Sequence, residues 1–345
     1  MRSLPRRAAL VLFALTLATS GLAAGAAHFK IARTIQLGGE GGWDYLTMDS
    51  PGQRLFVTHG THVQVVSTKT DKVLGDIPNT LGVHGVALAP ELNRGFTSNG
   101  RDSSVIAFDL KTYAVISQIK LDARNPDAIC YDPVSRRVFT FNGGSGNATA
   151  IDAASARVVG SVPLDGKPEF AVADGQGTMF VNIEDSSAVV AFDTRSLKVL
   201  HRWPIAPGEE PSGLAMDRKH RRLFSGCSNE TLVVIDADKG NVVASLPIGK
   251  GVDGVAFDAA RGLVFSSNGE GTLSVIHEDS PDKYSVIEKA DTQRGARTIA
   301  ADETTGSVFV VTADFGPAPA PTEDHPHPRP TIQPGTFRVL VMKRS

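Results

Sequence analysis

The chain contains few cysteines and, beyond its N-terminus, no long hydrophobic run. Cys130 and Cys227 are its only cysteines, and two thiols cannot supply the disulfide framework that stabilises many small exported domains. No later stretch of about 18 apolar residues is present to cross a bilayer. A hydrophobic core must therefore hold the fold, and the sequence predicts no membrane anchor.

The sequence signatures of several enzyme classes are also missing. There is no phosphate-binding Gly-Lys-Ser/Thr loop, no Gly-x-Ser-x-Gly nucleophile turn and no Cys-x-x-Cys-His haem attachment. Hydride, haem and phosphoryl chemistry therefore have no support, and the sequence requires no cofactor. Aromatic residues amount to only 6%, which is little for a surface that stacks nucleic-acid bases.

The N-terminus has the features of an export signal. Arg2, Arg6 and Arg7 precede an apolar run over residues 8–18, and small residues follow at 24–26. We predict a signal peptide over residues 1–26 and a periplasmic or secreted protein, soluble and monomeric, over residues 27–345. No cysteine lies near the cleavage site, which argues against a lipid anchor.

Without that segment the chain is mildly acidic. The segment removes three of the 35 basic residues and none of the 37 acidic ones. The remaining 32 basic and 37 acidic residues give a net charge of −5. This balance supplies no broad positive surface, so it disfavours nucleic acid and anionic lipid as partners.

One unit recurs seven times along the chain. A first strand ends at a marker residue, the markers are 41 to 44 residues apart, and a phenylalanine follows each marker by six or seven residues. Four short strands in roughly 40 to 45 residues is the period of a propeller blade. We therefore predict an all-β, seven-bladed β-propeller with four-stranded antiparallel blades. The markers are Asp49, Pro90, Asp132, Asp174, Asp217, Asp258 and Asp302, and the phenylalanines are Phe56, Phe96, Phe139, Phe180, Phe224, Phe265 and Phe309.

The seventh unit supplies only three strands of its own, over residues 296–301, 307–312 and 337–342. A surplus segment over residues 30–37 is similar to the fourth strands of other units, such as 158–164. We predict that this N-terminal strand completes the last blade and closes the ring. Closure removes the unpaired edges that an open sheet exposes.

These units resemble the YVTN-type repeat, with Phe56-Val57-Thr58 nearest to the tetrad and Arg222-Leu223-Phe224-Ser225 in a matching strand. From about residue 29 to residue 343 the chain is similar to YncE-like periplasmic propellers. The resemblance implies an exported seven-bladed propeller. It leaves the activity open, since nucleic-acid binding is proposed for some members.

Polar residues are expected to converge at one end of the central channel. The loops that precede each first strand and those between second and third strands share one face of a propeller, around the channel mouth. The position five residues before each marker should point into this mouth. Together with adjacent residues and second-strand ends, it gives a candidate ligand-binding set: Trp43, Asp44, His84, Asp127, Glu169, Ser212, Cys227, Asp253, Arg294 and Arg297.

Two interpretations of these residues are open. Several carboxylates around one channel repel one another and require a cation, an arginine partner or shared protons, so a divalent cation at the mouth is one option. Alternatively, Asp and Asn at strand ends cap turns through hydrogen bonds to the backbone. We favour that structural role for the Asn-Gly pairs at 99–100, 142–143 and 268–269, and simple packing for Cys227.

A long proline-rich loop over residues 313–335 separates the second and third strands of the seventh unit. Such a composition favours an extended path, and the topology predicts that the loop projects from the channel-mouth face as a lid. A disordered surface insertion is the alternative.

Three functions follow in order of preference. The first is a binding module that holds a small polar or cationic ligand, or a protein partner, at the channel mouth. The second is a metal-assisted hydrolase, lactonase or lyase that uses the channel carboxylates, although the sequence identifies no catalytic residue. The third is binding of single-stranded nucleic acid.

Overall fold

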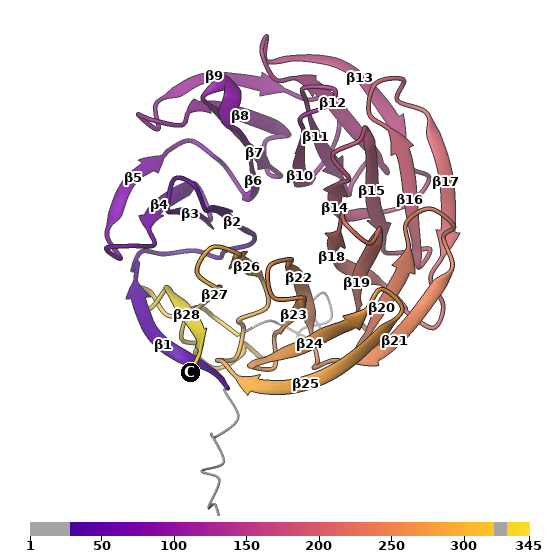
Figure 1. Ribbon diagram of the computed structural model, residues 1–345. Coiled ribbons are helices and arrows are strands. Elements are labelled where there is room, and N and C mark those ends of the chain that lie inside the picture. The colour runs from indigo at the N-terminus through magenta and orange to yellow at the C-terminus, as the bar shows by residue number, and fades with distance from the viewer. Residues whose placement is uncertain (1–27, 321–329) are drawn as a thin grey trace, which may run out of the picture.

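The computed structural model describes residues 28–320 and 330–345, and its strands form seven four-stranded antiparallel sheets. The sheets are arranged as blades around a ring (Figure 1), which confirms the predicted fold class. Blades 1 to 3 contain β2 (Leu46–Asp49), β3 (Arg54–His59), β4 (His62–Ser67) and β5 (Val73–Ile77); β6 (Val83–Ala89), β7 (Arg94–Asn99), β8 (Ser104–Asp109) and β9 (Val115–Lys120); and β10 (Pro126–Asp132), β11 (Arg137–Asn142), β12 (Asn147–Asp152) and β13 (Arg157–Pro163).

The remaining blades follow the same order from the inside outward. Blades 4 to 6 contain β14 (Pro168–Ala173), β15 (Thr178–Ile183), β16 (Ala188–Asp193) and β17 (Val199–Pro204); β18 (Pro211–Asp217), β19 (Arg222–Cys227), β20 (Thr231–Asp236) and β21 (Val242–Pro247); and β22 (Val252–Asp258), β23 (Leu263–Asn268), β24 (Thr272–Ser280) and β25 (Lys283–Asp291). Blade 7 contains β26 (Ile299–Asp302), β27 (Ser307–Thr312), β28 (Arg338–Arg344) and β1 (Phe29–Gln36).

The N-terminal strand closes the ring as predicted. β1 pairs with β28 in antiparallel register from Phe29 opposite Arg344 to Gln36 opposite Arg338. One sheet is thus made from both ends of the described chain, and Figure 1 shows indigo β1 beside yellow β28. The pairing leaves β28 with a partner on each side, so its backbone presents no open edge.

The repeated phenylalanine explains why the blades stack. In all seven units this side chain is 0 or 1% exposed. In blade 1, for example, Phe56 packs against Phe108 of blade 2 with ring centroids 5.9 Å apart. A four-stranded sheet cannot cover both of its faces alone, so each blade buries one face against the next.

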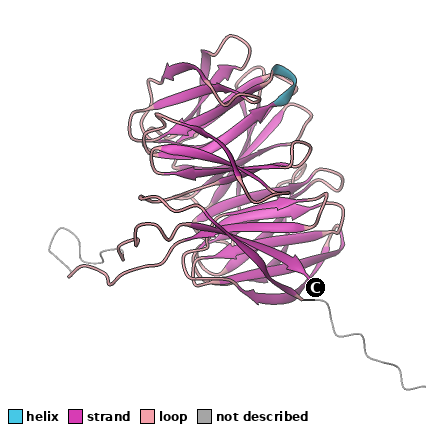
Figure 2. Ribbon diagram, turned by 90° about the vertical axis from the view of Figure 1, so that its left-hand side faces the viewer, coloured by secondary structure: helices cyan, strands magenta, loops and turns pink. Residues whose placement is uncertain are grey.

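The two faces of the ring differ. In Figure 2, the described part of the loop over residues 313–335 projects from one face, and the 3-10 turn η1 (Pro90–Leu92) lies on the other. Within the described residues, no helix is long and apolar enough to span a membrane. The predicted signal peptide lies outside those residues.

Candidate functional site

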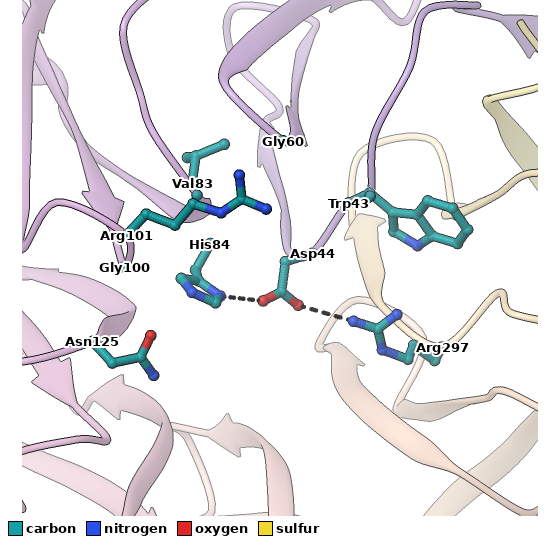
Figure 3. Close-up of a pocket in the computed structure, with 11 residues that line it drawn as sticks. Trp43, Asp44, Gly60, Val83, His84, Gly100, Arg101, Asn125 and Arg297 are labelled. Carbon is teal, nitrogen blue, oxygen red and sulfur yellow. Dashed lines mark hydrogen bonds and ion pairs between the residues drawn. The ribbon is translucent and has the colours of Figure 1, made fainter. Parts of the chain in front are cut away.

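A cavity of about 310 Å³ lies at the channel mouth. Its walls come from blades 1, 2 and 7 and from the loop before blade 3, because the loops leading into the first strands meet there. Figure 3 shows His84 and Arg297 on opposite sides of Asp44. The lining residues are Gly42, Trp43, Asp44, Gly60, Gly82, Val83, His84, Gly100, Arg101, Asn125 and Arg297.

His84 is held between two carboxyl groups. Its Nδ1 lies 2.6 Å from Asp44 Oδ2, in hydrogen-bond geometry, and 3.5 Å from Asp127 Oδ1. Burial opposes the charged imidazolium, but the hydrogen bond to Asp44 and the charges of Asp127 and Glu169 outweigh it and raise the pKa of His84 to about 9. At neutral pH the ring therefore carries a proton that it donates to Asp44.

Arg297 neutralises the other side of the mouth. Its Nε donates a hydrogen bond of 2.6 Å to Asp253 Oδ2, and its guanidinium lies 3.7 Å from Asp44 Oδ1. Asp44 thus sits between an imidazolium and a guanidinium. Pairing with positively charged side chains is one way to offset the repulsion within a ring of carboxylates.

Asp127 is the least satisfied of these acids. Its side chain is 15% exposed, and Oδ1 is buried without a hydrogen-bond donor among the described residues. Burial and repulsion from Asp44 and Asp253 outweigh the attraction of His84 and raise the pKa of Asp127 to about 6. The carboxylate is ionised at neutral pH and lacks a directed donor.

Glu169 forms a second acidic group with Glu184. Lys167 Nζ lies 2.9 Å from Glu169 Oε1 and also contacts Glu184. One ammonium group is thus shared by two carboxyl groups. Burial and repulsion from Asp127 outweigh the contact with Lys167 and raise the pKa of Glu169 to about 8.

Tyr45 lies next to Asp44 at the inner side of the mouth and is buried. Burial, followed by the charges of Asp127, Asp44, Asp253 and Glu169, raises its pKa well above the ordinary value. Its ring meets Phe170 of blade 4 edge to face, with centroids 4.9 Å apart. Further along the first strands, a cavity of about 460 Å³ is lined mainly by apolar side chains, including Phe170. The aromatic pair therefore lies between the polar residues of the mouth and the mainly apolar lining further along the channel.

Several predicted residues serve the framework instead of the cavity. Ser212 Oγ donates a hydrogen bond to the carbonyl oxygen of Val252 in the next blade. Cys227 is fully buried in an apolar cluster, and burial raises the pKa of its thiol to about 11. Both cysteines are free. Arg294 stands over the ring of Phe315, 5.8 Å from its centroid, at a separate surface pocket.

Trp43 connects the mouth to the long loop. Its indole is 7% exposed and packs against Phe337 and Phe315, with centroids 5.4 and 6.0 Å away. In the described part of the loop, Phe315 bridges to Ile332 and forms a narrow stem. The stem stands at the rim of the cavity. The predicted lid includes residues 321–329, which lie outside the described residues.

The asparagines at the ends of second strands have a structural role. Asn99, Asn142 and Asn268 are fully buried. Each accepts a hydrogen bond of 2.9 to 3.0 Å from a Thr or Ser hydroxyl two residues earlier. The repeated Thr/Ser-x-Asn pattern therefore secures the strand end and does not face a ligand.

Four residues of the site were absent from the predicted set. Tyr45 directly follows Asp44, and Lys167 lies two positions before Glu169, so both adjoin positions that the repeat singled out. Arg101 lines the cavity from the β7–β8 turn and Asn125 from the loop before β10, two residues before Asp127. Lys167 could have been predicted from the sequence, because clustered carboxylates require cations nearby and it lies close to a predicted acid.

Comparison with known proteins supports the fold alone. No family model and no curated protein matches the chain, so the YVTN and YncE-like resemblance stays a prediction. The solved structure of U3-55K is similar, with a TM-score of 0.74 and 8% identity, over 89% of this chain and 97% of that one. At this identity the likeness shows a shared seven-bladed β-propeller and transfers no partner or activity.

Proposed function

We propose that this protein is an exported binding module whose channel mouth holds a small organic cation. The main support is Asp127, an ionised and largely buried carboxylate with no directed hydrogen-bond donor among the described residues. A buried carboxylate without a donor is costly, and an ammonium group supplies both charge and donors. Export rests on the predicted signal peptide and on the YncE-like resemblance.

The surroundings of Asp127 favour a cation that also carries polar groups. His84 already donates its Nδ1 proton to Asp44, and Lys167 is shared between Glu169 and Glu184. Neither can fully neutralise Asp127. At the rim, exposed Arg101 and the Asn125 amide offer contacts to the polar or anionic end of a ligand. A small zwitterion therefore fits as well as a simple ammonium ion.

Trp43 provides the readout for a binding experiment. The chain has only two tryptophans, so Trp203→Phe leaves Trp43, which lines the cavity, as the single fluorophore. We would titrate this protein with ethanolamine, choline and glycine betaine, using glycerol and acetate as neutral and anionic probes. Ethanolamine, choline or the zwitterion should change the emission, and the affinity should rise from pH 5 to pH 8 as Asp127 and Glu169 ionise.

Two variants test whether the cationic probes bind at the mouth or elsewhere on the surface. Asp127→Asn removes the charge at constant size and should weaken binding of the cationic probes by roughly tenfold or more. Asp122→Asn is the matched control, because this exposed carboxylate has no ion pair among the described residues. Equal responses to glycerol and to the cations, or binding that persists in Asp127→Asn, would contradict the proposal.

A metal-assisted hydrolase is the second candidate. Donor atoms of Asp44, His84 and Asp127 lie within 4.8 Å of one another, which is compatible with a divalent cation. The raised pKa of His84 counts against it, because a metal ion must displace the shared proton. Lactone or ester hydrolysis that requires an added divalent ion, and that is lost in His84→Ala, would favour this candidate over simple binding.

A further inference from the structure

A second group of one histidine and two carboxylates lies on the opposite face of the ring. Asp217 ends β18, and His220 stands in the turn that leads to β19. Glu278 lies near the end of the extended strand β24 in the next blade. Their donor atoms lie within 4.8 Å of one another. Because the first-to-second and third-to-fourth turns share the face remote from the channel mouth, this group is independent of the candidate site.

The two carboxyl groups are buried, and no lysine or arginine among the described residues forms an ion pair with either of them. The side chains of Asp217 and Glu278 are 4 and 5% exposed. Burial and the charge of Asp217 raise the pKa of Glu278, which shows that the carboxyl groups are close enough to repel. Arg222, which begins β19, directs its guanidinium to Asp282 and to the carbonyl oxygen of Pro281.

The contacts inside this group are close but are not aligned as hydrogen bonds. His220 Nδ1 lies 2.6 Å from Asp217 Oδ2 and 3.3 Å from Glu278 Oε1. Yet Asp217 Oδ2 and His220 Nδ1 are both buried and have no hydrogen-bond partner among the described residues. At the channel mouth, by contrast, His84 donates an aligned hydrogen bond to Asp44. The second group therefore brings three donor atoms together without an aligned hydrogen bond between His220 and Asp217.

We propose that Asp217, His220 and Glu278 bind a first-row divalent metal ion, with Zn²⁺ as the reference ion. One imidazole nitrogen and two carboxylate oxygens form a donor set suited to Zn²⁺ or Mn²⁺, whereas Ca²⁺ takes oxygen ligands only. Donor atoms about 2 Å from one ion stand roughly 3.3 Å apart, a separation that His220 Nδ1 and Glu278 Oε1 already have at 3.3 Å, whereas the 2.6 Å contact between His220 Nδ1 and Asp217 Oδ2 must lengthen.

The surrounding residues orient these ligands. Asp217 Oδ1 accepts a hydrogen bond of 2.9 Å from the backbone N–H of Lys219, which leaves Oδ2 for the ion. The Tyr284 hydroxyl donates to the carbonyl oxygen of Pro281 at 2.7 Å and lies 3.3 Å from Glu278 Oε1. The His220 side chain is 32% exposed, so water can reach the ion and fill a fourth position. The ion would join blades 5 and 6.

The test measures metal binding by tag-free, chelator-treated full-length protein. We expect one Zn²⁺ per chain by calorimetry and elemental analysis, with a raised Tm, and no comparable effect of Ca²⁺. His220→Ala and Glu278→Gln should each reduce the affinity for Zn²⁺ by at least about tenfold. The exposed control Asp122→Asn should bind Zn²⁺ as the unmodified protein does, and so should the double variant His325→Ala/His327→Ala, which removes the two histidines of the proline-rich loop.

The outcomes separate this site from the other candidates. Absence of stoichiometric Zn²⁺, retention of tight binding in His220→Ala, or loss of binding in Asp127→Asn instead would overturn the proposal. If a variant fails to fold, the unmodified protein still decides the question. In ¹⁵N-detected NMR of its histidines, added Zn²⁺ should shift the Nδ1 resonance of His220, and an unmoved resonance refutes coordination.

Discussion

Tyr45 and Phe170 meet across the central channel, edge to face, although their blades are three apart in the ring. The contact adjoins the polar mouth, because Tyr45 directly follows Asp44 and Phe170 directly follows Glu169 along the chain. Phe170 also lines the apolar cavity on the other side. This aromatic pair thus lies where the polar mouth gives way to the mainly apolar part of the channel.

Replacement of Tyr45 should therefore cost stability. Tyr45→Ala removes a ring that is 6% exposed and should lower the free energy of unfolding by about 3 kcal/mol. Tyr45→Phe keeps the ring and should cost less than about 1 kcal/mol. Denaturant unfolding followed by far-UV circular dichroism measures both. Equal stability of the alanine variant and the unmodified protein would show that the pair is not tightly packed.

Stability should fall as the pH rises. The folded-state pKa values of Asp127, Glu169 and His84 are raised to about 6, 8 and 9, from ordinary values of 3.8, 4.5 and 6.5. Between each pair of values the folded state binds more protons than the unfolded state, so the free energy of unfolding decreases with pH. The decrease should be clearest in Tm from about pH 6.5 to about pH 9, because burial lowers the pKa of His59 to about 4 and this shift acts in the opposite direction below pH 6.5.

Glu169→Gln identifies the contribution of one carboxyl group to this slope. Glutamine cannot ionise, so the variant should lose less stability than the unmodified protein between pH 5 and pH 8. Asp122→Asn, the exposed control, should follow the unmodified protein throughout. A slope unchanged in Glu169→Gln would mean that Glu169 titrates in the folded protein near its ordinary pKa.

The ring was predictable because the repeat is periodic. A buried phenylalanine recurs at one place in every unit, and a period of 41 to 44 residues allows four short strands. Ring closure was predictable by counting strands. The same count places Asp44, Asp127 and Asp253 at the mouth, since the first strand of every blade begins there.

Side-chain direction at the mouth was less predictable. β18 carries a register shift between Pro211 and Leu214, but β10 and β14 carry the same shift at the equivalent place, so the shift does not distinguish Ser212 from the acids. The short Ser212 hydroxyl bonds to the neighbouring blade, and Cys227, opposite Pro211 in the ladder, packs into the core. Spacing along the chain contains no information on where such a short side chain finds its partner, nor on the reach of a flexible side chain such as Lys167.

The buried asparagines are expected to contribute to stability but not to ligand binding. Asn142 donates to Asn147 Oδ1 at 2.8 Å and Thr149 Oγ1 at 2.9 Å, and accepts from the Thr140 hydroxyl. Asn142→Ala leaves these buried groups unpaired and should destabilise the protein by about 1 to 3 kcal/mol. Ligand binding at the mouth should not change once the variant is folded.

An exposed asparagine controls for that measurement. Asn229 also makes a side-chain hydrogen bond, to the carbonyl oxygen of Pro207, but at the surface. Asn229→Ala should shift the stability by no more than about 0.5 kcal/mol. Comparable losses in Asn142→Ala and Asn229→Ala would argue against a special role for the Thr/Ser-x-Asn pattern.

The last prediction concerns the strand β1, which closes the ring. Ile35 of β1 is 3% exposed and packs in the apolar cluster of Phe309, Val339 and Val341. Ile31, in the same strand, is 36% exposed. Ile35→Ala should lower the free energy of unfolding by about 3 kcal/mol, while Ile31→Ala should cost under about 1 kcal/mol. Hydrogen exchange of the β28 amides should accelerate only in the first variant, because they lose protection when β1 detaches. If exchange accelerates equally in both variants, β1 is held mainly by its backbone pairing and the buried face of Ile35 contributes little to closure.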